Sequence, residues 1–264
     1  MTGELRIDHL SKVYQSDKGP LASHNVFDDV TFGVKAGEFV SVIGPSGCGK
    51  STLLNIIAGL DRASQGAVFI DERAVSGPGM DRSMVFQEFA LFPWLNVRDN
   101  IIFGLKSLGL SAAERGARAA KYIKLVGLDR FSDYYPNRLS GGMRQRVGIA
   151  RALAVEPAVL LMDEPFGSLD ALTRRSMQAA LSDIYLRTRK TVLFITHDID
   201  EAIYLSDRVL LLSGEPSRLS LELRIDLPRP RDHRSGAFQG HVETLQQAII
   251  QSRSASSINT EANL

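Results

Sequence analysis

The chain has 264 residues, 44% of them hydrophobic, which is enough for one large domain or two small ones with buried cores. Lysine and arginine number 31 against 30 aspartate and glutamate residues, and this balance argues against a nucleic-acid partner. The single cysteine, Cys48, excludes an intrachain disulfide bond and is typical of a reducing compartment, so we expect the cytosol.

The first predicted elements are strands. Apolar residues alternate loosely with charged ones over residues 5–11, and residues 67–70 form a second short apolar run. We expect these to be antiparallel strands that flank the core. Residues 39–43 are rich in β-branched side chains and stop at Gly44, which predicts a buried strand that enters a loop.

The middle of the chain alternates between helical and strand patterns. Residues 96–128 turn helical and more charged, which predicts a helical subdomain inserted at about residues 88–155. The apolar residues of the segment 172–185 recur at helical spacing and predict a crossover helix. Such alternation is typical of an α/β fold with a mostly parallel sheet covered by helices. Three further apolar runs predict central strands: residues 158–162, 191–196 and 208–212.

The end of the chain has a different composition. Residues 228–232 alternate proline and arginine and are interpreted as a linker. An amphipathic stretch at residues 242–249 predicts a docked helix, and the polar residues 252–264 predict a disordered tail. We therefore place the main domain at residues 1–230 and the C-terminal helix and tail at residues 231–264.

A phosphate-binding loop is predicted where the strand at residues 39–43 ends. Its two fixed glycines, lysine and hydroxyl residue lie between that strand and an apolar helical segment, so a chance glycine-rich turn is the weaker interpretation. Backbone N–H groups cradle phosphate oxygens where glycine permits close approach, and a helix N-terminus favours anions. We expect Lys50 to reach the β- and γ-phosphates of ATP and Ser51 to hold Mg²⁺. The expected nucleotide-binding residues are Gly44, Pro45, Ser46, Gly47, Cys48, Gly49, Lys50, Ser51 and Thr52.

Two carboxylates follow the predicted strand at residues 158–162. Asp163 is expected to hold Mg²⁺ directly or through water, and Glu164 to orient or deprotonate the attacking water. A solvated acidic turn is the alternative, but two unpaired charges at a buried strand end would be costly without a cation.

Two more polar residues end strands. His197 follows the run at residues 191–195 and is a candidate γ-phosphate contact or water-orienting group, although a lone histidine is more often structural. Gln87 follows a short run at residues 83–86, and without further context a glutamine at this position is more often a surface residue.

The segment Leu139-Ser140-Gly141-Gly142-Met143 resembles the signature motif of ABC (ATP-binding cassette) ATPases. Its place between the phosphate loop and the Asp163 strand is that family's order. From the residues alone, a serine N-cap before two glycines predicts a helix over residues 143–153. This helix could simply be capped by the serine, or its N-terminal N–H groups could bind a phosphate.

The resemblance extends from Tyr14 to about Asp232 and implies a P-loop NTPase (RecA-like) core with an antiparallel β subdomain and the inserted helical subdomain. It implies a head-to-tail dimer of two copies, or of this chain and a related cassette, in which the signature of one subunit completes the other's ATP site. Met143 and Ser168 depart from the glutamine and alanine that many members carry, without removing a phosphate or metal ligand. The roles carried over are adenine stacking for Tyr14, Mg²⁺ contact and transmission for Gln87, phosphate contact for Ser140, Gly141 and Gly142, a loop across the dimer for Ser168, Leu169 and Asp170, and the switch histidine for His197.

The segment 88–95 is unusually apolar and contains the single tryptophan, Trp94. Exposed, it would mark a partner surface; buried, it would be subdomain core. In the family this region receives a coupling helix from the membrane subunit. Together with the phosphate loop, Met143 and residues 196–205, it looks like the nitrate, sulfonate, taurine and bicarbonate importer branch. That branch implies a permease, a periplasmic or lipid-anchored substrate-binding protein and a place on the cytoplasmic face of the inner membrane.

Two rival functions were weighed against an importer ATPase. A soluble ABC ATPase that acts on DNA would carry long coiled coils between Ser51 and Leu139, and ribosome-acting members usually carry two cassettes. A regulatory module without turnover is disfavoured by intact Lys50, Asp163 and Glu164. Residues 1–14 lack a signal-peptide layout and the apolar runs are far shorter than the roughly 20 residues of a membrane span, so a membrane role requires another chain.

Overall fold

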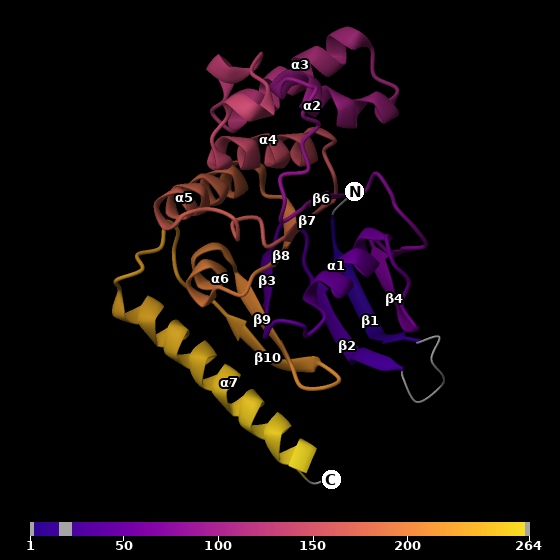
Figure 1. The fold of residues 1–264 in the computed structure, drawn as a ribbon, viewed down its shortest axis with the longest axis vertical. Helices are drawn as coiled ribbons and strands as arrows, with labels where there is room; N and C mark the ends of the chain where they lie inside the picture. Colours follow the sequence, from indigo (N-terminus) through magenta and orange to yellow (C-terminus); the bar gives the residue numbers. More distant parts are fainter. Residues whose placement is uncertain (1–2, 16–22, 262–264) are drawn as a thin grey trace.

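The computed structural model describes residues 3–15 and 23–261 (Figure 1). Within these residues, a larger sheet of six strands has the order β10-β9-β3-β8-β7-β6, and a smaller sheet of four has the order β2-β1-β4-β5. Neighbours in the larger sheet are parallel except β10 on β9, and the smaller sheet is antiparallel. The strands are β1 (Leu5–Tyr14), β2 (His24–Val34), β3 (Phe39–Ile43), β4 (Gln65–Ile70), β5 (Arg73–Ala74), β6 (Arg82–Val85), β7 (Val159–Asp163), β8 (Thr191–Ile195), β9 (Arg208–Ser213) and β10 (Arg218–Arg224).

Helices cover both faces of the larger sheet, which confirms the predicted α/β fold. Helix α1 packs with the smaller sheet on one face, and α5 and α6 pack on the other, with α7 alongside α6. In the described part of the chain, no helix is both long and apolar enough to cross a bilayer. The helices are α1 (Lys50–Ala58), α2 (Val97–Leu105), α3 (Ala112–Leu125), α4 (Gly141–Ala154), α5 (Ala171–Thr188), α6 (Ile199–Leu205) and α7 (Gly236–Glu261), with single 3₁₀ turns at Lys106–Leu108, Asp129–Phe131 and Pro136–Arg138.

Strand β3 divides the apolar interior into two cores. Phe39 and Ile43 face the core beneath α4, α5 and α6, whereas Val40 and Val42 face the core that contains α1 and the smaller sheet. All four side chains are at most 1% exposed. Successive side chains of a strand point to opposite faces, so a strand buried on both faces is apolar throughout. This explains why the central strands were visible in the sequence.

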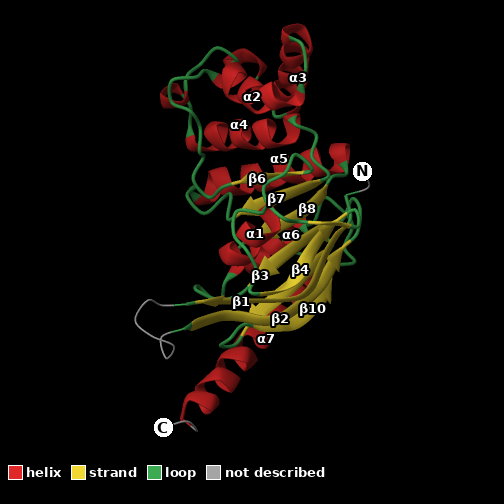
Figure 2. Ribbon diagram, turned by 90° about the vertical axis from the view of Figure 1, so that its right-hand side faces the viewer, coloured by secondary structure: helices red, strands yellow, loops and turns green. Residues whose placement is uncertain are grey.

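Helices α2, α3 and α4 form a helical subdomain that stands above the larger sheet (Figure 2). Ser111 and Glu114 start α3 with reciprocal side-chain to backbone hydrogen bonds, an arrangement that satisfies two otherwise unpaired N–H groups. The fully buried Asn100 of α2 donates to the carbonyl oxygens of Phe92 and Leu95. This amide therefore fixes the apolar stretch before α2 onto the subdomain.

The proline and arginine segment at residues 228–232 connects β10 to α7 and is held against the domain by its arginine side chains. Arg231 is 6% exposed and donates to four backbone carbonyl oxygens, and burial lowers its pKa to about 10. Arg229 pairs with Asp207 at 2.5 Å. A guanidinium carries five donors in a fixed plane, which lets a charged side chain replace water with several carbonyl groups at once. The alternating sequence did not reveal these carbonyl partners.

Helix α7 is docked through its first turns and continues to Glu261. Phe238 and Leu245 are fully buried and Val242 is 7% exposed. Disorder was expected from Ser252 onward because the composition is polar, but the helix continues, and no glycine or proline interrupts residues 252–261. Residues 262–264 lie outside the described part of the chain.

Replacement of Phe238 by alanine should lower the free energy of unfolding by about 3 kcal/mol, because a fully buried ring would leave a cavity between α6 and α7. Ile250→Ala is the matched control on the same helix, since Ile250 is 64% exposed and should change stability by no more than about 0.5 kcal/mol. Denaturant unfolding curves of both variants make the measurement. Equal effects would contradict the docking of α7.

Candidate functional site

The predicted phosphate, acidic and histidine residues meet at one edge of the larger sheet. Strands β3, β8, β7 and β6 are parallel neighbours, so their carboxyl ends lie together. In the ladder Val42 pairs with Ile195, and Ile195 with Asp163. The loops that start at Gly44, Glu164 and Thr196 therefore leave the sheet side by side.

The loop between β3 and α1 requires glycine for two different reasons. A side chain at Gly44 would overlap the carbonyl oxygen of Leu212, and a Cβ at Gly49 would lie 2.5 Å from Val26 Cγ1. Gly47 has φ +84°, in the left-handed region that favours glycine, but nothing lies within 4 Å of where its Cβ would be. The loop is thus packed on its inner side and open at Gly47, which fits close approach of a phosphate to the backbone.

Lys50 places a buried cation inside this loop. Its Nζ donates to the carbonyl oxygens of Gly44 and Pro45 at 2.9 and 2.8 Å, and the residue is 6% exposed. Cys48 Sγ lies 3.8 Å from the same nitrogen, and burial raises the pKa of this thiol, which suits a neutral space-filling residue better than a reactive one. The Lys50 ammonium is held by two carbonyl groups at the start of a helix, and this positive region is suited to binding an anion.

Ser51 and Asp163 form a pair of hard oxygen donors. Ser51 Oγ donates to Asp163 Oδ1 at 3.1 Å. Burial raises the pKa of Asp163, the Ser51 hydroxyl opposes this rise, and the charge of Glu164 adds to it. Among the described residues no group of three or more histidine, cysteine or acidic side chains is arranged so that it could hold a metal ion. Magnesium is commonly held by one or two protein oxygens together with phosphates and water, and the oxygens of Ser51 and Asp163 fit this coordination.

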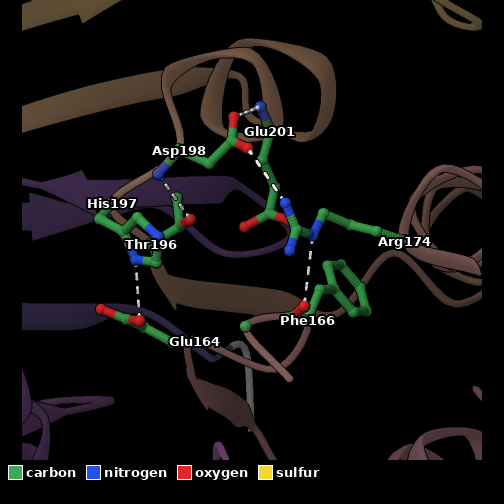
Figure 3. Close-up of a pocket in the computed structure, with 8 residues that line it drawn as sticks. Glu164, Phe166, Arg174, Thr196, His197, Asp198 and Glu201 are labelled. Atoms are coloured by element: carbon green, nitrogen blue, oxygen red, sulfur yellow. Dashed lines mark hydrogen bonds and ion pairs between the residues drawn. The ribbon is translucent and has the colours of Figure 1, made fainter. Parts of the chain in front are cut away.

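Glu164 and His197 are in direct contact (Figure 3). His197 Nδ1 lies 2.9 Å from Glu164 Oε2, and the histidine side chain is 61% exposed against 20% for the glutamate. Glu164 has φ +40°, an unusual value for a residue with a side chain and typical of functional loops. A Cβ on Gly167 would lie 3.4 Å from Gln87 Nε2 and 3.8 Å from Glu164 Oε2. The glutamine amide and the glutamate carboxylate therefore both lie close to Gly167.

Tyr14 is anchored by two residues that the sequence did not identify. Its hydroxyl donates to Asp61 Oδ2 at 2.7 Å, and Lys12 Nζ donates to Asp61 Oδ1 at 2.7 Å while lying 4.4 Å from the Tyr14 ring centroid. Asp61 follows Gly59, the residue that ends α1. The ring, 43% exposed, is thus tied to the helix that begins at the phosphate loop. Lys12 lies two residues before Tyr14 on β1, but no local signal in the sequence points to Asp61.

The signature residues form a second polar region. Ser140 Oγ caps α4 by accepting from Met143 N at 3.3 Å. A Cβ on Gly142 would lie 2.8 Å from Thr173 Cγ2, and one on Gly141 would lie 3.2 Å from Leu169 Cδ2. Within the described residues, their neighbours thus come from the segment that starts α5 and from Phe89, and not from the phosphate loop.

Asp170 belongs to this second region. Its Oδ1 accepts from the backbone N–H groups of Leu172 and Thr173 at 3.1 and 3.0 Å and so caps α5. Hydrogen bonds from Thr173 lower the pKa of this exposed carboxylate. An open cleft of about 400 Å³ lies alongside, lined by Ser140, Gly142 and Thr173 among others. The predicted site residues therefore occupy two places in one chain.

The apolar stretch at residues 88–95 is both core and surface. Phe89 and Leu91 pack against the main core, whereas Trp94 is 70% exposed. The Phe92 ring lies 5.7 Å from that of Trp94 and 4.3 Å from that of Phe103, which is 45% exposed. An exposed aromatic surface of this kind is a candidate contact with another molecule.

Known proteins resemble this chain over most of its length. A family model described as ABC transporter matches residues 27–167. The nitrate import ATP-binding protein NrtD of Synechocystis sp. is 48% identical over 224 residues, 85% of this chain and 83% of that protein. The taurine import ATP-binding protein TauB of Pseudomonas aeruginosa is 50% identical over 204 residues, 77% of this chain and 78% of that protein. A dimeric, post-hydrolysis structure of the ATP-binding cassette MJ0796 bound to ADP and Pi matches with a TM-score of 0.71 at 33% identity, covering 85% of this chain and 100% of that one.

Replacement of Asp61 by asparagine should lower the pKa of Tyr14. The hydrogen bond to the Asp61 carboxylate is the main reason why this pKa is raised, because a negative neighbour disfavours the phenolate. The measurement is a titration of ¹³Cζ-tyrosine NMR signals, with Tyr14→Phe to assign the resonance. Tyr185, whose pKa burial and Asp207 raise to about 12, is the internal control and should not move. An unchanged Tyr14 pKa would contradict the anchoring role of Asp61.

Proposed function

The chain belongs to the ABC transporter ATP-binding family and is an ATPase, and on this premise we propose that it drives import of a small, anionic solute of the nitrate, sulfonate or taurine type through a separate permease. The observation that carries the proposal is the arrangement of two contacts around an open phosphate loop. Ser51 meets Asp163 and Glu164 meets His197, at the ends of neighbouring strands. A module that binds MgATP without turnover would need the first pair but not the second.

ATP binding is assigned to the loop from Gly44 to Thr52 and to Tyr14. The backbone of Gly47 and Gly49 and the N-terminus of α1 receive the phosphates, and Lys50 exchanges its carbonyl partners for phosphate oxygens. Tyr14, held by Asp61, offers its exposed ring to the adenine.

Mg²⁺ is assigned to Ser51 and Asp163, and Gln87 is assigned as a third ligand from the resemblance to the family. The ion would supply charge neutralisation for the phosphates, the chemistry common to ATPases of this class. The hydroxyl and carboxylate oxygens are already in contact, so the protein presents the two ligands together. Their position at the start of α1 and the end of β7 joins the phosphate loop to the acidic strand end.

Hydrolysis is assigned to Glu164 as the group that orients and deprotonates water. His197 holds the Glu164 carboxylate through its Nδ1 and leaves most of its ring exposed for a γ-phosphate. Gln87, which like Glu164 lies close to Gly167, is assigned to sensing whether the site is filled.

We assign the second polar region to a partner subunit. Ser140, Gly141, Gly142 and Asp170 lie away from the chain's own phosphate loop, and α4 presents the N–H groups of its first turn beside Ser140. A head-to-tail pair of two copies would bring these groups to the partner's ATP. The dimeric form of the MJ0796 cassette with ADP and Pi supports this arrangement, and a related cassette could replace the second copy.

The aromatic surface of Phe92, Trp94 and Phe103 is assigned to the permease. The names of NrtD and TauB describe import ATP-binding proteins, and the lack of a membrane-spanning helix among the described residues fits a subunit that is peripheral to the membrane. We place it on the cytoplasmic face of the inner membrane. A periplasmic or lipid-anchored binding protein would deliver the solute, and no nucleic acid takes part.

Glu164→Gln should retain MgATP binding and lose at least about 100-fold of the steady-state hydrolysis rate, the scale of a lost general base. The amide keeps the shape and the contact with His197 but cannot accept the proton from water. Equilibrium titration with MgATP and a phosphate-release assay make the two measurements. Near-normal turnover would remove Glu164 from the assigned role.

The importer assignment predicts a membrane complex. When the chain is expressed with its chromosomal neighbours, it should fractionate with membranes through a co-purifying hydrophobic subunit. Trp94→Ala should weaken that association because Trp94 is the most exposed ring of the aromatic surface, whereas Tyr135→Ala, at another exposed ring, should not. A purely soluble chain would favour the alternative, a soluble ABC ATPase that acts on DNA or ribosomes.

A further inference from the structure

Arg174, in the first turn of α5, lies beside the contact between Glu164 and His197 (Figure 3). It lines the same small cavity as those two residues and as Asp198 and Glu201. None of the roles described above requires an arginine at this position. The contacts of its side chain show what it does there.

The guanidinium of Arg174 joins two loops. Nε donates to the carbonyl oxygen of Phe166 at 3.4 Å, and one terminal nitrogen donates to the carbonyl oxygen of Leu169 at 3.0 Å. The other terminal nitrogen lies 3.9 Å from Asp198 Oδ2. Phe166 and Leu169 belong to the loop that follows Glu164, and Asp198 follows His197. One side chain thus spans the loops that carry both members of the pair.

The side chains around the Arg174 guanidinium are polar, and hydrogen bonds hold most of them in place. Asp198 uses its other oxygen to cap α6 by accepting from Glu201 N at 3.0 Å. Glu201 is 3% exposed, and its carboxylate accepts from Gln178 Nε2 at 3.2 Å. Burial raises the pKa of Glu201, and the charge of Arg174 opposes that rise. A planar fork that serves two carbonyls and faces acidic groups is suited to arginine and not to lysine.

These contacts connect the two loops at both ends. The backbone leads from Glu164 to Leu169, Arg174 links Leu169 to Asp198, and His197, the residue before Asp198, contacts Glu164. Two backbone hydrogen bonds, from Gly167 N to Glu164 O at 3.0 Å and from Leu169 N to Phe166 O at 3.1 Å, stiffen the backbone from Glu164 to Leu169. The contact between Glu164 and His197 therefore depends on a second link between the same loops.

We propose that Arg174 is a positioning residue for ATP hydrolysis, which ties the loop after Glu164 to the loop after His197 and so holds the reacting carboxylate in place. The proposal rests on the assigned role of Glu164. It also places Arg174 between Glu164 and the segment from Ser168 to Asp170, which would face the partner subunit. Arg174 itself touches neither nucleotide nor water in this role.

Arg174→Met should lower kcat for MgATP hydrolysis about 10- to 100-fold, the scale of a misplaced reacting group, and leave KM within about twofold. Arg175→Met is the matched control, because Arg175 is an exposed neighbour on the same turn and should keep the wild-type rate. Arg174→Lys retains the charge but not the fork, so it should recover the rate only in part. Equal kcat values for Arg174→Met and Arg175→Met would overturn the proposal.

Hydrogen exchange measured by mass spectrometry tests the same link without turnover. In Arg174→Met the amides of residues 166–170 should exchange faster, because the loop loses two carbonyl anchors, while peptides from β3 and β8 stay as in the wild type. Unchanged exchange in that loop would overturn the proposal even if hydrolysis fell. A wild-type protein that binds but does not hydrolyse MgATP would instead overturn the role of Glu164, and the exchange result would still decide the position of Arg174.

Discussion

The parallel alignment of β3, β6, β7 and β8 is the constraint on which the rest of the structure depends. The carboxyl ends of parallel strands lie at one edge of the sheet. The strand pairing alone therefore brings together residues that are far apart in the sequence. The register is specific: Asp163 pairs with Ile195, which sets Glu164 opposite the Thr196 and His197 turn. A slip of one residue would turn every side chain of a strand to the other face and exchange the contents of the two cores.

This constraint explains how much could be predicted from the sequence. Strands β3, β7 and β8 are buried on both faces, and the phosphate loop, the two carboxylates and the Thr196-His197 turn lie at or directly after their ends. Each apolar run and the functional residues that follow it are therefore visible together in the sequence. The anchors of Tyr14 are not, because Lys12 and Asp61 meet only through the packing of β1 on the end of α1. The carbonyl groups that hold Arg231 come from α6 and from the chain after β10, and no local pattern shows such a convergence.

The short helix α6 shows why the docking of the segment at residues 228–232 matters for the site. It has seven residues and begins directly after Asp198, too short for stable helix formation without support. Arg229 and Arg231 donate to the carbonyl oxygens of Leu205 and Ile203 at its end, where cations also interact favourably with the helix dipole. Arg174 faces Asp198 at its start. Arginines thus act at both ends of the helix that follows His197.

The segment from Glu164 to Asp170 connects the two polar regions, and its length limits how independently they can act. Glu164 lies at the sheet edge, and Asp170 caps α5 beside the signature glycines. Backbone hydrogen bonds within the segment and the two carbonyl contacts of Arg174 leave few freely rotating bonds between them. In the proposed dimer, a partner that moves Asp170 or Leu169 must therefore also displace Glu164. Coupling between subunit contact and hydrolysis then follows from the stiffness of one short loop and needs no longer pathway.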